Sequence, residues 1–154
     1  MAILCMVISC ICCGIDLLFK RKIENGAMQA RDFKRVPLKI RRAHHNAGFL
    51  MNTLDDKPEV VQKIGLVTAM FFALYQIFLL GSKKCAAAKI SGALMFGGAI
   101  SNLYDRMVRG YVVDYVSVKT KWEKVGKIVF NIADVCVFLG GIGLVLFSSR
   151  EKRG

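Results

Sequence analysis

Metal-ligating side chains are few in this sequence of 154 residues. Its only two histidines are the neighbours His44 and His45, and the sequence offers no second cluster of ligands to complete a site with them. Six cysteines are present, but no Cys-x-x-Cys pair has histidines at the spacing of a zinc site. All six lie in or beside apolar stretches, where we expect them to act as small hydrophobic residues. The sequence therefore predicts neither a bound metal nor a cofactor.

Acidic residues are also scarce, with 11 Asp and Glu against 23 Lys and Arg and a formal net charge of +12. Nucleic-acid binding is a poor explanation for this excess, because the basic residues flank apolar stretches and form no module with aromatic residues. Attraction to an anionic lipid surface explains it more simply. We therefore expect membrane lipids, and no nucleic acid, among the partners. No internal repeats, low-complexity tracts or linkers divide the chain, so a single domain over residues 1–154 is expected.

Long apolar stretches dominate what is present. Hydrophobic residues make up 55% of the chain and the mean hydropathy is +0.44, which is too apolar for a soluble domain of this size. Four stretches, at residues 2–19, 60–80, 85–103 and 128–147, are each about 18–21 residues long, close to the roughly 20 that a helix needs to cross a bilayer. Because backbone groups must pair internally in lipid, we predict an all-α membrane protein built as a bundle of four transmembrane helices.

The first apolar stretch has an alternative interpretation as a cleaved signal peptide. No Lys or Arg precedes it, so the basic segment that opens a signal peptide is missing. Asp16 stands near its far end and is followed by the basic cluster Lys20-Arg21-Lys22. We therefore expect this stretch to be retained as a membrane span.

Two segments outside the predicted spans indicate a small β-rich surface subdomain. The longer covers residues 21–59 and alternates apolar and polar residues in Val36-Pro-Leu-Lys-Ile-Arg41. The shorter contains Gly110-Tyr-Val-Val-Asp114, with a similar alternation that continues beyond Asp114. This pattern is typical of short strands, and we expect the shorter segment to lie at the mouth of the bundle.

Carboxylates at the ends of apolar stretches are the most informative feature of the sequence. Asn102-Leu-Tyr-Asp105 ends the third stretch and Asn131-Ile-Ala-Asp134 opens the fourth. A carboxylate inside such a stretch costs on the order of 3 kcal/mol on insertion scales, so it is either satisfied by a neighbour or functional. Residues three apart share a helix face, which allows Asn131 to hydrogen-bond Asp134. In a helix that starts at residue 128, Asp134 would lie about six residues in, roughly 9 Å below the start of the span.

Small residues predict which helices are neighbours. The third and fourth stretches are rich in glycine, which lets helix backbones approach closely in a membrane. The glycines concerned are Gly92, Gly97, Gly98, Gly140, Gly141 and Gly143. Contact between these two helices would bring the two Asn-x-x-Asp tetrads together. Asp114 could then meet Asp134 just beneath the membrane interface.

Two carboxylates that meet in a low-dielectric site share one proton and titrate as a pair. One can then act as the base for a water molecule while the other donates a proton, which is the chemistry of aspartic proteases. Proton-coupled transporters also place carboxylates in membranes, so the spacing alone leaves both functions open. Asp105 and Arg106 likewise admit a purely structural interpretation as an interfacial ion pair.

Three blocks of this sequence resemble the signature blocks of the lipoprotein signal peptidase family, also called signal peptidase II. They are Gly97-Gly-Ala-Ile-Ser-Asn-Leu-Tyr-Asp-Arg106, Gly110-Tyr-Val-Val-Asp114 and Phe130-Asn-Ile-Ala-Asp134, in the family's order and spacing. His45-Asn46-Ala-Gly48 is similar to a further block in the loop after the first helix. The first-helix block departs from the family, because Asp16-Leu-Leu-Phe-Lys20 stands where Asp-Gln-x-Thr-Lys is usual.

The resemblance implies an aspartic endopeptidase with Asp114 and Asp134 as its catalytic pair. The residues implied to support the pair or bind substrate are Asp16, Asn46, Asn102, Asp105, Arg106 and Asn131. The implied substrates are diacylglyceryl-modified prolipoproteins, cut before the lipidated cysteine, and the implied location is the bacterial cytoplasmic membrane. A monomer is expected. A proton-coupled transporter and a non-catalytic binder of lipidated chains remain alternatives.

Two features of the sequence predict opposite orientations in the membrane. The basic residues of the first loop, such as Arg41, would place that loop in the cytoplasm by the positive-inside rule. The family layout instead implies an extracytoplasmic loop and cytoplasmic termini. We follow the family layout, because Asp114, Asp134 and the loop must lie on one side whichever way the bundle faces.

Overall fold

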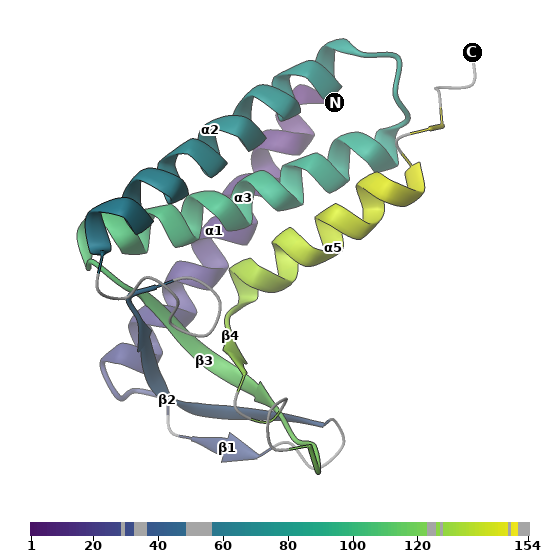
Figure 1. Ribbon diagram of the computed structural model, residues 1–154. Coiled ribbons are helices and arrows are strands. Elements are labelled where there is room, and N and C mark those ends of the chain that lie inside the picture. The colour runs from purple at the N-terminus through teal and green to yellow at the C-terminus, as the bar shows by residue number, and fades with distance from the viewer. Residues whose placement is uncertain are drawn as a thin grey trace.

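The computed structural model describes residues 1–28, 30–32, 37–48, 57–122, 126, 128–147 and 149–150. Within this part, four helices run alongside one another and a small sheet lies at one end of them (Figure 1). The helices are α1 (Ala2–Glu24), α2 (Pro58–Gly81), α3 (Ala86–Val108) and α5 (Ile132–Phe147). The strands are β1 (Arg31–Asp32), β2 (Leu38–Asn46), β3 (Val112–Val118) and β4 (Val129–Phe130). The start of α1 and the end of α5 lie at the end of the bundle away from the sheet.

Helix α3 is the centre of the bundle, because it packs against α1, α2 and α5. Glycines make these approaches possible. A Cβ atom on Gly98 would overlap the Ala133 carbonyl of α5, and one on Gly97 would come within 2.7 Å of the Ser9 carbonyl of α1. The Ser9 hydroxyl also donates a hydrogen bond to the Ala93 carbonyl at 2.8 Å. The predicted contact between the third and fourth apolar stretches is therefore confirmed.

The sheet is antiparallel with the order β1-β2-β3-β4, and both strand predictions are confirmed in β2 and β3. The buried residues Ile23, Ile40, Val113 and Tyr115 join the sheet to the last turn of α1 in one small apolar core. This core fixes β3 across the mouth of the bundle. Residues 29, 33–36 and 49–56 of the predicted 21–59 segment lie outside the described residues.

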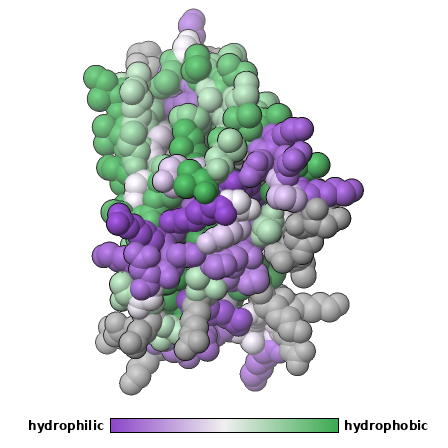
Figure 2. Space-filling model, turned by 90° about the vertical axis from the view of Figure 1, so that its left-hand side faces the viewer, coloured by the Kyte–Doolittle hydropathy of each residue, from purple (hydrophilic) through white to green (hydrophobic). Residues whose placement is uncertain are grey.

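The surface divides into an apolar and a polar part. Apolar side chains cover the helices in the upper half of Figure 2, and hydrophilic ones gather over the sheet end. Large apolar side chains such as Val67, Phe71 and Leu74 on α2 are more than half exposed, which is typical of a lipid-facing surface. By length and composition, two helices in the described part, α1 and α2, could cross a membrane. Helix α5 is also apolar but has 16 residues.

The fourth apolar stretch begins as a strand rather than as a helix. Val129 and Phe130 pair with Ser117 and Val116 of β3, so α5 starts at Ile132, four residues later than the predicted start of the span. The apolar pattern could not separate these residues from the helix, because a short buried strand is as apolar as a membrane span. The consequence is that Asp134 lies in the first turn of α5 instead of about six residues into it.

Candidate active site

The tetrad Asn131-Ile-Ala-Asp134 forms the N-terminal cap of α5. The Asn131 side-chain oxygen accepts the Asp134 backbone N–H at 2.9 Å, and an Asp134 carboxylate oxygen accepts the Asn131 backbone N–H at 3.1 Å. This reciprocal arrangement is a capping box, which satisfies two backbone donors at the start of a helix. The predicted contact between the two residues therefore exists, but it runs through backbone N–H groups. It orients the Asp134 carboxylate at the mouth of the bundle.

Asp114 is held between two asparagines. It lies on β3 and is only 2% exposed. Asn46 of β2 donates its side-chain N–H to one carboxylate oxygen at 3.1 Å, and Asn131 donates to the other at 2.8 Å. Asn131 thus donates its side-chain N–H to the Asp114 carboxylate and its backbone N–H to the Asp134 carboxylate. Asn131 therefore links Asp114 of β3 to Asp134 of α5 as a shared hydrogen-bond partner.

Asn102 of α3 joins the other side of the site. Its side-chain N–H donates to Asp134 at 2.8 Å, while its side-chain oxygen accepts hydrogen bonds from Asn131 at 3.2 Å and from the Lys20 ammonium at 2.8 Å. Asn102 therefore links the buried Lys20 ammonium to the Asp134 carboxylate through two hydrogen bonds. The tetrad Asn102-Leu-Tyr-Asp105 thus contributes its asparagine directly to the site.

Lys20 also belongs to this site, although it is not among the residues that the resemblance implies for it. It is fully buried and lies 2.7 Å from an Asp16 oxygen and 3.0 Å from an Asp105 oxygen. A buried ammonium requires such anionic partners, since the cost of burying an unpaired charge is high. The spacing of Asp16 and Lys20, which places both on one face of a helix, was a usable signal. The contacts with Asp105 and Asn102 depend on the packing of α1 against α3.

Asp16 and Asp105 do not line the cavity, and both form ion pairs with Lys20. Asp105 also accepts hydrogen bonds from the Arg109 guanidinium at 2.6 Å and from the Val113 backbone at 3.3 Å. Its carboxylate thereby fixes the turn between α3 and β3. Asp105 forms ion pairs with Lys20 and Arg109.

Arg106 faces the cavity from the last turns of α3. Its guanidinium donates to the Gly48 carbonyl at 3.4 Å, and its own backbone carbonyl accepts a hydrogen bond from Gln62 of α2 at 3.0 Å. The contact with Gly48 shows that a backbone carbonyl can reach this guanidinium. It also links the block of Asn46 and Gly48 to α3.

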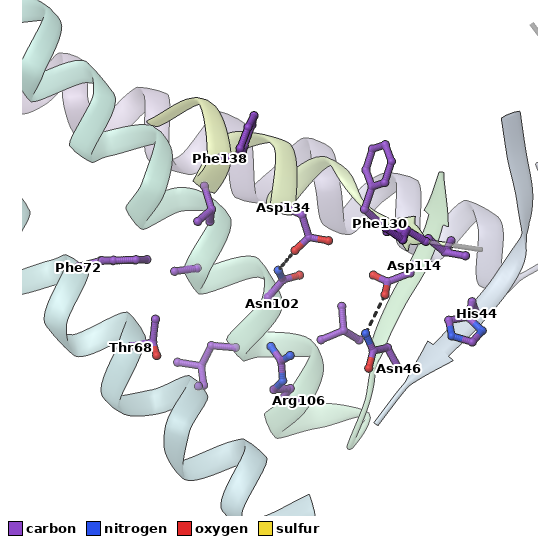
Figure 3. A pocket seen from close by; sticks show the side chains of 17 residues that line it. His44, Asn46, Thr68, Phe72, Asn102, Arg106, Asp114, Phe130, Asp134 and Phe138 are labelled. Atoms are coloured by element: carbon purple, nitrogen blue, oxygen red, sulfur yellow. Dashed lines mark hydrogen bonds between the residues drawn. The ribbon is translucent and has the colours of Figure 1, made fainter. Parts of the chain in front are cut away.

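A cavity of about 740 Å³ opens between α2, α3, α5 and the sheet. Asp114, Asp134, Asn46, Asn102 and Arg106 line its polar end, and Figure 3 shows these side chains reaching it from four different elements. Its remaining walls are largely apolar, with Phe72, Leu103, Phe130, Val137 and Phe138 among the lining residues. A concave apolar cavity with a few convergent polar groups is the usual form of a binding site.

Burial and the negative charge of Asp134 together raise the pKa of the Asp114 carboxyl to about 7. The hydrogen bonds from Asn46 and Asn131 favour the ionised form and oppose this shift. A carboxyl with a pKa near 7 is present in both protonation states at neutral pH. It can therefore either give or take a proton during a reaction.

Comparison with known proteins places this arrangement in context. A family model described as signal peptidase (SPase) II matches residues 8–150. The lipoprotein signal peptidase of Clostridioides difficile (strain 630) is 30% identical over 149 residues, which cover 91% of this chain and 93% of that protein. The one of Vibrio vulnificus (strain CMCP6) is 32% identical over 112 residues, covering 70% of this chain and 64% of that protein, just under two thirds of its length. A solved structure described as a bacterial membrane enzyme shares the fold, with a TM-score of 0.77 at 21% identity over 97% of this chain and 93% of the other.

Proposed function

We propose, because this chain belongs to the signal peptidase II family, that it is an intramembrane aspartic endopeptidase that removes signal peptides from diacylglyceryl-modified prolipoproteins. The observation that carries the proposal is the pair of aspartates on one cavity. Asp114 and Asp134 come from β3 and α5, line the same polar end, and share Asn131 as a hydrogen-bond partner. In this proposal the cut precedes the lipidated cysteine.

The reaction follows from a pair that holds one proton. The ionised carboxylate takes a proton from a water molecule, whose oxygen attacks the carbonyl carbon of the scissile peptide bond. The protonated carboxyl donates its proton to the carbonyl oxygen, so that a neutral tetrahedral intermediate forms. Collapse of this intermediate breaks the C–N bond: the protonated carboxyl of the pair gives its proton to the leaving amine, and the other carboxylate takes a hydroxyl proton from the intermediate, which leaves a carboxylic acid product and a pair that again holds one proton. The raised pKa of Asp114 supports a proton on the pair at neutral pH.

The supporting residues have separate roles in this proposal. Asn46, Asn102 and Asn131 orient the two carboxylates through the hydrogen bonds described above. Asp16 and Asp105 hold Lys20, which in turn holds Asn102. Arg106 binds backbone carbonyls of the substrate with its planar fork of donors, in the way that it meets the Gly48 carbonyl. The apolar cavity walls receive the lipid-modified segment.

We also propose that all four helices cross the membrane of a bacterial cell. The 16 residues of α5 span about 24 Å at 1.5 Å per residue, and the strand before it continues to the interface. Both termini lie in the cytoplasm, the sheet lies outside it, and the protein acts as a monomer. Since the start of α1 and the end of α5 lie at the end away from the sheet, this orientation puts the cavity mouth on the outer side.

The test is cleavage of a lipidated precursor by the purified protein. We expect cleavage of a peptide that carries a diacylglyceryl-modified cysteine, with the new N-terminus at that cysteine. The same peptide without the diacylglyceryl group is the matched control and should be cut poorly. A protein that leaves both peptides intact but carries protons across liposomes would be a transporter. One that retains the lipidated peptide uncut would be a binder of lipidated chains.

A further inference from the structure

Tyr115 follows Asp114 in β3 and has no part in the cavity lining. Because successive side chains of a strand point to opposite faces, Tyr115 faces away from the cavity into the core. It is 1% exposed. Its ring stacks against Phe19 of α1, with ring centres 6.3 Å apart and an angle of 13° between the planes. This packing holds the hydroxyl group in one place.

The Tyr115 hydroxyl joins α1 to the start of α5. It donates to an Asp16 carboxylate oxygen at 3.2 Å and accepts the Ile132 backbone N–H at 3.4 Å. The same Asp16 oxygen accepts the Ala133 backbone N–H at 3.1 Å. Burial raises the pKa of the Tyr115 phenol, so the hydroxyl remains a neutral donor.

The start of α5 is therefore held by three different side chains. The N–H groups of Ile132, Ala133 and Asp134 meet Tyr115, Asp16 and Asn131 in turn. The first N–H groups of a helix have no partner within the helix, so their partners decide where it begins and how it is oriented. The carboxylate of Asp16 also suits the positive end of the helix dipole.

We propose that Tyr115 is a positioning residue, whose hydroxyl holds β3 and α5 at the spacing that the reaction of Asp114 with Asp134 requires. Its backbone is adjacent to Asp114, and its hydroxyl contacts the helix two residues before Asp134. One side chain thus connects both carboxylate-bearing elements. This role rests on the proposed function, since it concerns the same pair of aspartates.

The variant that tests this role is Tyr115→Phe, which keeps the ring and its contact with Phe19 and removes only the hydroxyl. We expect kcat for the lipidated peptide to fall about three- to tenfold, the effect of one lost hydrogen bond, with KM unchanged within about twofold. Tyr104→Phe on α3 is the matched control, because Tyr104 is 47% exposed and lies outside the cavity lining. Unchanged kcat in Tyr115→Phe, or a higher KM with parental kcat, overturns the role.

A second readout does not depend on cleavage. The infrared band of the protonated Asp114 carboxyl, identified by its loss in Asp114→Asn, reports the pH at which this group titrates. In Tyr115→Phe we expect its midpoint to move down by at least about half a pH unit, because a looser α5 start weakens the influence of the Asp134 charge. A midpoint equal to that of the parent and of Tyr104→Phe overturns the role. If the parent cuts no lipidated peptide, the proposed function fails, while this midpoint still decides the role of Tyr115.

Discussion

At the scale of a single residue, hydrogen bonds fix the position of the Asp114 carboxylate while burial changes its pKa. Its two asparagine partners hold the carboxylate in place, while burial and Asp134 raise its pKa to about 7. In the unfolded chain the same group titrates near 3.8. The folded protein therefore binds the proton more tightly than the unfolded chain. Stability must fall as pH rises from about 4 to about 7, and then remain level as far as this group is concerned.

Replacing Asp114 by asparagine should remove this penalty. We expect the midpoint of thermal unfolding of Asp114→Asn in detergent to exceed that of the parent at pH 8, where the parent's carboxylate is charged. At pH 4 both side chains are neutral and of similar shape, so the two proteins should unfold within about 2 °C of each other. An equal difference at both pH values would show that Asp114 titrates normally in the folded protein.

For Arg106, the role of the planar guanidinium geometry can be tested separately from the role of its positive charge. If its planar fork binds substrate carbonyls, Arg106→Lys should lose about 1–3 kcal/mol of transition-state binding, because an ammonium cannot reproduce the bidentate geometry. The measurement is kcat/KM for the lipidated peptide in the Lys and Ala variants, at matched folding. Parental cleavage by Arg106→Lys combined with failure of Arg106→Ala would instead make Arg106 an electrostatic anchor.

Among the elements, the contact of α3 with α5 depends on glycines, and Gly98 is the one beside the site. A methyl group on Gly98 would overlap the Ala133 carbonyl, in the turn that carries Asp134. Gly98→Ala should therefore push the start of α5 away from α3, costing about 1–3 kcal/mol of stability and most of the cleavage activity. Gly141→Ala on α5 is the control, since nothing lies within 4 Å of the added atom.

Thermal unfolding and kcat, measured side by side on the two glycine variants, check this prediction. Gly141→Ala should behave like the parent in both. Parental unfolding and kcat in Gly98→Ala would mean that the two helices can separate there without disturbing Asp134.

The helices and the two longer strands could be predicted because their signals are local. The apolar stretches and the alternation around Asp114 are patterns of neighbouring residues. The predicted start of α5 is wrong because a short strand is as apolar as a membrane span. The capping-box spacing of Asn131 and Asp134 is the local signal that marks where the helix begins. The burial of Lys20 and the link through Tyr115 arise only when α1, α3 and α5 pack together. Neighbouring residues indicate only the pairing of Asp16 with Lys20, through their spacing on one helix face.

For the whole molecule, the proposed orientation in the membrane predicts which residues can be labelled from outside the cell. The sheet lies at one end of the bundle, with the start of α1 and the end of α5 at the other. The polar end of the cavity includes residues of the sheet strands β2 and β3. In the proposed orientation, a cysteine at Thr120, which is exposed beside β3, should react with an impermeant thiol reagent in intact cells. A cysteine at Ser149 should react only after the cells are opened. Both are placed in a cysteine-free background.

The reverse labelling, at Ser149 but not at Thr120 in intact cells, would place the sheet in the cytoplasm. It would also show that the positive-inside rule outweighs the family layout in this chain.

The central claim is that Asp114 and Asp134 together cleave the peptide bond, and single-residue amide variants test it most directly. Asn keeps the shape of each side chain but cannot relay the proton. Purified Asp114→Asn and Asp134→Asn should each fold and bind lipidated precursor yet leave it uncut, while Asp32→Asn, at an exposed carboxylate on β1, should cut it like the parent. Substantial turnover by either of the first two variants would contradict the account.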